Sequence, residues 1–88
     1  MLNEKIKNSK LYEYLKIDLN FNLQHDLLFN VKVILDLILD IETVLNIRDS
    51  SNINLSVKKS NIDNLLQYDN KYKNDLQEFL KENKIKIK

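Results

Sequence analysis

Cysteine, glycine, proline, alanine and tryptophan are all absent from this chain of 88 residues. Without cysteine there is no disulfide framework, no thiolate metal site and no cysteine nucleophile. Without glycine and proline, tight turns must be made by asparagine, aspartate and serine, which adopt turn geometries less freely. We therefore expect a few long elements with loose connections rather than many short strands.

Leucine and isoleucine supply 26 of the residues, which is enough apolar material to disfavour disorder. A chain of this length is expected to form a single domain, residues 1–88, around one small core. The formal net charge is +1. The N-terminal segment lacks the apolar stretch and the small-residue cleavage site of a secretory signal, so the expected location is the cytoplasm.

The stretch from Asp26 to Ile47 predicts the central helix, because its apolar residues recur at steps of three and four. These residues are Leu27, Val31, Ile34, Ile38, Ile41 and Leu45. Further apolar residues widen the stripe until a narrow polar strip remains, which indicates a buried helix. Lys32, Asp36, Asp40 and Glu42 would each cost about 2–4 kcal/mol at the centre of a bilayer. A membrane span is therefore rejected.

A second helix is predicted for residues 60–84, after a polar loop at 48–54. Ser60 and Asp63 have the spacing of a capping box. The apolar stripe of this helix is interrupted at Asp69 and consists of Ile62, Leu65, Leu66, Tyr72, Leu76, Phe79 and Leu80. Together the two helices, residues 26–48 and 60–84, predict an all-α bundle built on a long antiparallel helical hairpin.

The segment 15–23 is ambiguous, because its apolar residues alternate strictly with polar ones. A period of two is typical of a half-buried strand, whereas Asp18, Asn20 and Asn22 are poor strand formers. A strand and an extended apolar loop are both open here. Similar alternation at 53–57 and 84–88 gives an alternative fold class, α+β with three short strands at 15–23, 53–57 and 84–88. The first residues form a weak helical pattern with Asn3 as a candidate cap.

Candidate catalytic chemistry is sparse, and we expect no enzyme, no metal site and no cofactor. His25 is the single histidine, next to Asp26 at the expected start of the central helix. A metal site needs three or four ligands, and a general base needs a nucleophile nearby. Asp36 and Asp40 are one helical turn apart and could share a cation, but we expect them to form the solvated strip of their helix.

Eight lysines lie between residues 58 and 88, which raises a nucleic-acid-binding regulator as the alternative function. Five carboxylates are interleaved with these lysines, and the chain has one arginine. Mixed charge of this kind is typical of a solvated helix face.

The preferred function is a non-enzymatic protein–protein interaction module that binds and occludes a partner protein, as small inhibitor, immunity and antitoxin-like proteins do. The tyrosines are the candidate partner interface, because tyrosine is enriched where proteins meet: Tyr12, Tyr14, Tyr68 and Tyr72. The central helix has more apolar surface than one neighbouring helix covers, so a homo-oligomer is also expected. The candidate oligomer interface consists of Val33, Leu37, Val44 and Ile47.

From Asp26 onward, DLLF and the helix ending in DIETVLNI resemble the second helix of acyl and peptidyl carrier proteins. In those families an aspartate–serine pair opens a helix that ends near a glutamate. With Glu42 aligned on that glutamate, Asn30 and Val31 stand at the aspartate–serine positions. Val31 has no hydroxyl to carry a phosphopantetheine arm. The resemblance is confined to this helix and implies a carrier-like fold that lacks the modified serine and its chemistry.

Overall fold

The protein is described by a computed structural model that covers residues 2–88. Those residues form five α-helices, one short 3-10 helix and two strands of two residues each. The elements in chain order are α1 (Glu4–Lys7), α2 (Lys10–Gln24), α3 (Leu28–Ser51), β1 (Ser56–Val57), α4 (Lys59–Tyr68), η1 (Asn70–Tyr72), α5 (Lys73–Glu82) and β2 (Lys86–Ile87). The expected all-α bundle is confirmed.

Helix α3 is the predicted central helix, although both of its ends differ from the expectation. It begins at Leu28 because Asp26 has a φ of 55°, in the left-handed region that a helix cannot include. It continues to Ser51 and ends at Asn52, whose φ is 58°. Asparagine here fills the left-handed position that glycine usually occupies at a helix end. The loop predicted at 48–54 therefore begins four residues later than expected.

Residues 15–23 lie within helix α2, so the strand and the extended loop expected there are both wrong. Ser9 caps this helix, since its side chain accepts a hydrogen bond from the Tyr12 backbone N–H at 3.0 Å. The alternating apolar residues fall on different sides of the helix. Leu15 is fully buried, whereas Ile17 and Phe21 are more than half exposed.

The second arm of the predicted hairpin is two helices rather than one. Asp69 has extended backbone angles and separates α4 from η1, where its side chain accepts from the Lys71 N–H at 3.0 Å. The predicted capping box is wrong, because α4 begins at Lys59, before Ser60. The start of α4 is instead hydrogen-bonded to α3, where the Asp40 carboxylate accepts from the Lys58 backbone N–H at 2.8 Å.

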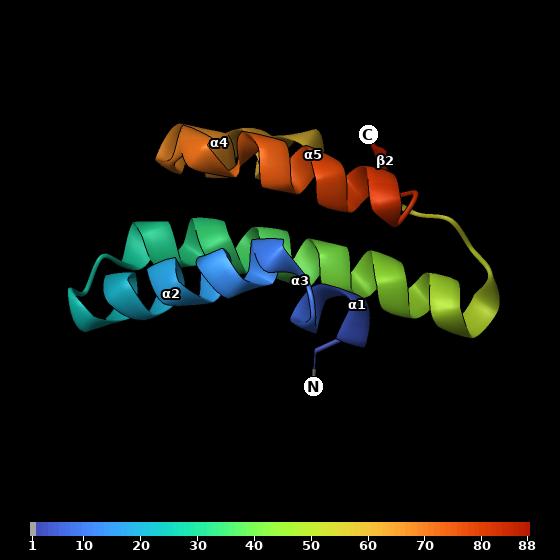
Figure 1. Ribbon diagram of the computed structural model, residues 1–88, viewed down its shortest axis with the longest axis horizontal. Helices are drawn as coiled ribbons and strands as arrows, with labels where there is room; N and C mark the ends of the chain where they lie inside the picture. Colours follow the sequence, from blue (N-terminus) through green and yellow to red (C-terminus); the bar gives the residue numbers. More distant parts are fainter. Residues whose placement is uncertain (1) are drawn as a thin grey trace.

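Strands β1 and β2 pair in parallel, with Ser56 opposite Lys86 and Val57 opposite Ile87. They are the parts of the predicted strands at 53–57 and 84–88 that form. Because β1 precedes α4 and β2 follows α5, the pairing of the two strands means that the chain leaves β1 along α4 and returns to it along α5. Figure 1 shows these two helices as a layer over α2 and α3.

The core lies between these two layers and joins residues from every helix. Its fully buried members include Ile6, Leu15, Ile34, Leu37, Ile41, Leu45, Leu65, Tyr72 and Leu76. Among residues 2–88, none of the helices combines the length and the apolarity needed to cross a lipid bilayer.

Candidate interaction surface

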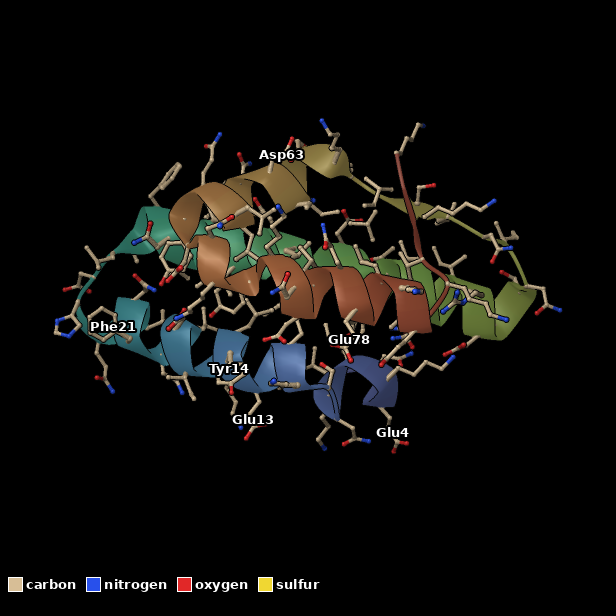
Figure 2. The ribbon with its side chains drawn as sticks, turned by 45° about the horizontal axis from the view of Figure 1, so that its top comes forward. Glu4, Glu13, Tyr14, Phe21, Asp63 and Glu78 are labelled. Atoms are coloured by element: carbon tan, nitrogen blue, oxygen red, sulfur yellow. The ribbon has the colours of Figure 1, made fainter. Side chains whose placement is uncertain are left out.

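Five large apolar side chains surround the turn between α2 and α3 and remain exposed to solvent. They are Phe21, Leu23, Leu27, Leu28 and Phe29, with exposed fractions between 44% and 78%. We call this group the apolar tip. The turn lies at one end of the bundle in Figure 1, and Figure 2 shows Phe21 there. A cluster of exposed apolar side chains at one end of a small protein is typical of an interaction surface.

The tip is held by a tight chain reversal. Asp26 adopts its left-handed backbone conformation, and the Leu27 N–H donates to the Asn22 carbonyl at 2.9 Å. The ring of Phe21 lies 4.4 Å, centroid to centroid, from the ring of His25. Phe21 and Leu23 lie in the last turn of α2, and Leu28 and Phe29 in the first turn of α3, so the apolar side chains flank a hydrogen-bonded turn.

The inward side of this same region carries a buried asparagine. Asn22 is 1% exposed, and its Nδ2 donates to the Asp18 carbonyl at 2.7 Å and to the Tyr68 hydroxyl at 3.0 Å. Its Oδ1 accepts from Asn30 Nδ2 at 3.0 Å. All of its hydrogen-bonding atoms thus have partners, as burial requires. The usual arrangement is inverted here, with a polar side chain inside and apolar side chains outside.

A groove runs beside the tip, between α3 and α4. Helix α3 contributes Phe29, Asn30 and Val33, and helix α4 contributes Asn64, Gln67 and Tyr68. Its volume is about 430 Å³, within the range of about 300–1,000 Å³ that is common for ligand sites. The six lining residues include three carboxamides and two aromatic rings, but no carboxylate, ammonium or imidazole group.

A smaller cleft of about 190 Å³ lies between α2 on one side and η1 and α5 on the other. Its charged groups are largely satisfied by one another, since Lys10 lies 3.8 Å from Asp75 and Lys71 lies 2.9 Å from Asp18. The hydroxyl of Tyr72 donates to the Asp18 carboxylate at 2.5 Å. Burial first, and then this hydrogen bond, raises the pKa of Tyr72 above its usual range. The hydrogen bond to Asp18 likewise raises the pKa of Lys71.

The four predicted interface tyrosines do not form one surface. Tyr14 and Tyr72 line the small cleft, but Tyr72 is itself buried. Tyr68 lines the groove between α3 and α4, and Tyr12 is half-buried against the core. The structure therefore divides this set between two depressions and the edge of the core.

The predicted oligomer face is mostly covered by the chain itself. Val33, Leu37 and Val44 are buried, and Ile47 is half-buried. Helix α4, strand β1 and the other core elements occupy the surface that we expected a second copy to cover. Exposed apolar side chains instead lie at the tip and along the outer side of α3, where Leu39 is 57% exposed, and also at Ile17, Ile53, Leu55 and Ile87.

The two aspartates of the central helix have separate partners. Asp36 pairs with Lys32 at 2.7 Å, and the Asp40 carboxylate accepts from the Lys58 N–H and from Asn61 Nδ2. Within residues 2–88 no group of three or more His, Cys, Asp or Glu side chains is placed to hold a metal ion. Val31, at the carrier-protein serine position, is buried.

Sequence reasoning missed the tip because it assigned Leu27 and Leu28 to a buried helix and residues 15–23 to a strand or loop. The available signal was the run of apolar residues on both sides of the polar His25–Asp26 pair, where the chain turns. Comparison with protein-family models, with curated proteins and with solved structures gives no match to this chain.

Proposed function

We propose that this protein is a non-enzymatic protein-interaction module of the cytoplasm that binds a partner protein through the apolar tip and covers part of its surface. The observation that carries the proposal is the inverted arrangement at the turn between α2 and α3. Phe21 and Leu28 are exposed there while Asn22 is buried. Large apolar side chains that stay exposed gain little burial free energy on folding, and an apolar partner surface would supply it on binding.

The size of the tip suits the centre of an interface. With exposed fractions of 44% to 78%, its five side chains present on the order of 400 Å² of apolar surface. A standard protein interface buries about 800 Å² on each partner, with an apolar centre and a polar rim. The tip would supply that centre, and the polar residues around it would supply the rim. Covering a functional surface of the partner would give the inhibitor-, immunity- or antitoxin-like role expected from the sequence.

The test compares two variants in capture from native extract of the cells that make the protein. The tip variant carries Phe21→Ser and Leu28→Ser, and the control carries Ile53→Ser. Ile53 is 54% exposed and lies two residues after the end of α3, and Figure 1 shows this end of α3 opposite the turn between α2 and α3. We expect a protein held in near-stoichiometric amount by the unmodified chain and by the control, and lost by the tip variant. Equal retention by both variants, or no retained protein, would contradict the proposal.

Sedimentation velocity on the purified chain identifies self-association as a separate outcome. If the partner is a second copy, as the expected homo-oligomer requires, the unmodified chain and the Ile53→Ser control will form a larger species at micromolar concentration. The tip variant will then remain monomeric.

A further inference from the structure

We propose that the groove between α3 and α4 binds a neutral, extended peptide segment, with one apolar side chain of that segment seated against Phe29, Val33 and Tyr68. This inference rests on the proposed function, because it names the kind of segment that the partner protein presents. Phe29 belongs to both the groove and the tip, and the other groove residues lie outside the tip.

The first support is the charge of the lining. Charged residues make up 31% of this chain, yet the six lining residues of the groove contain none. A charged ligand would leave water without gaining an opposite charge, which is costly. The small cleft between α2 and α5 differs in this respect, since Lys10, Lys71 and Asp75 line it. The groove therefore selects an uncharged ligand.

The second support is the type of polar group. Asn30, Asn64 and Gln67 each carry a carboxamide, which offers one acceptor oxygen and one donor nitrogen, as a peptide unit does. A helical segment uses its own backbone groups internally, whereas an extended segment leaves N–H and C=O groups free along its edges. Carboxamides on both walls of a groove therefore fit an extended backbone better than a helix.

The third support is that these carboxamides are available. Asn64 and Gln67 are exposed and are three residues apart on α4, so both lie on the side of that helix that faces the groove. Within residues 2–88 neither side chain makes a hydrogen bond. Asn30 is already oriented, because its Nδ2 donates to the buried Asn22, and its oxygen remains as an acceptor. Fixing one wall in advance lowers the entropy lost on binding.

The experiment selects ligands from a displayed library of random dodecapeptides on the immobilised full chain, without any natural partner. We expect enriched peptides to be uncharged around one large apolar residue. A synthetic peptide of the enriched sequence is then measured by isothermal titration calorimetry. The double variant Asn64→Ala and Gln67→Ala is expected to weaken its affinity about 4- to 140-fold, since each lost hydrogen bond contributes a factor of about 2 to 12.

Helix α5 offers a matched control. Asn74 and Gln77 are also exposed and three residues apart, but neither lines the groove. The variant Asn74→Ala and Gln77→Ala is expected to bind the peptide within twofold of the unmodified chain. Charged enriched peptides, no enrichment, or equal affinities for the two double variants would each overturn the inference.

The tip variant separates this inference from the proposed function. Phe21 and Leu28 belong to the tip but do not line the groove. If the tip variant no longer captures the partner but binds the peptide as tightly as the unmodified chain does, both proposals are supported. A second outcome is possible, in which peptide binding depends on Asn64 and Gln67 but no partner protein is captured through the tip. That outcome would support peptide binding by the groove and contradict the proposed function.

Discussion

Replacing Asp40 by alanine tests how the two layers of this bundle are joined. Its Oδ2 accepts from the Lys58 backbone N–H at 2.8 Å and from Asn61 Nδ2 at 3.0 Å, which holds the first turn of α4 against α3. Each hydrogen bond contributes about 1 kcal/mol, so their loss costs about 2 kcal/mol. We expect Asp40→Ala to lower the free energy of unfolding by about this amount, less the small gain from the higher helix propensity of alanine.

Asp36→Ala is the matched control, one turn earlier on the same helix. Alanine forms helices better than aspartate by about 0.6 kcal/mol, and this gain is common to both variants. Asp36 loses only its exposed pair with Lys32, which contributes about 0.3–0.5 kcal/mol. The two variants should therefore differ by about 1.5 kcal/mol. For 88 residues this corresponds to a difference in Tm of about 6–12 °C.

The assay is urea unfolding followed by circular dichroism, with thermal unfolding as a second measure. An unchanged dependence of the free energy on urea concentration would show that the mutation acts on stability and not on the compactness of either state. Asp40→Asn, which keeps an acceptor oxygen, should recover part of the loss. If Asp40→Ala and Asp36→Ala fall within 0.5 kcal/mol of each other, on the order of normal scatter, the role assigned to Asp40 is wrong.

The folded state raises the pKa of Tyr72 above 10.0 and the pKa of Lys71 above 10.5, so both groups contribute their full stability below these values and lose it as the pH rises past them. Tyr72→Phe should therefore reduce the fall of the urea midpoint with pH between pH 8 and pH 11. If the midpoint falls with pH as steeply in the variant as in the unmodified chain, the role assigned to Tyr72 is wrong. Asn22→Ala should cost about 2–3 kcal/mol by calorimetry, whereas the exposed Asn20→Ala should change stability by less than about 0.5 kcal/mol. Fluorescence anisotropy with labelled duplex DNA should show no salt-sensitive affinity; a slope equivalent to several phosphate contacts would favour the nucleic-acid alternative.

Local sequence pattern was sufficient to predict the helical class and the central helix of this protein. Apolar residues at steps of three and four place Ile34, Ile41 and Leu45 on one side of α3, and all three are fully buried. Asn3 was identified as a cap because a short polar side chain beside the first helical residues can accept their N–H groups, and it accepts from the Lys5 N–H at 3.0 Å. These features depend on residues within a few positions of one another.

Helix α2 and the apolar tip depended on contacts between distant residues. The alternation of Leu15, Ile17 and Phe21 has no helical burial signature, because the helix exposes two of these three side chains. The polar side chains on the inner side of this helix have hydrogen-bond partners far along the chain. Asn22 donates to Tyr68, 46 positions away, and Asp18 accepts from Tyr72, 54 positions away. The pattern of a single segment carries no information about such partners.

The groove and the break in the second arm were likewise decided by tertiary structure. Sequence showed an interruption at Asp69 but not that α5 runs back from the end of α4, so that Ile87 pairs with Val57. Asn64 and Gln67 look like ordinary solvated helix residues until α4 packs on α3 and sets them opposite Asn30. Sequence by itself therefore determined the helical class and which helix is central, because both follow from apolar periodicity in residues 26–47 and 60–82, but it did not determine that residues 15–23 are helical. The tertiary structure decided which apolar and amide side chains remain outside, because burial is a property of neighbours that the chain brings together only on folding.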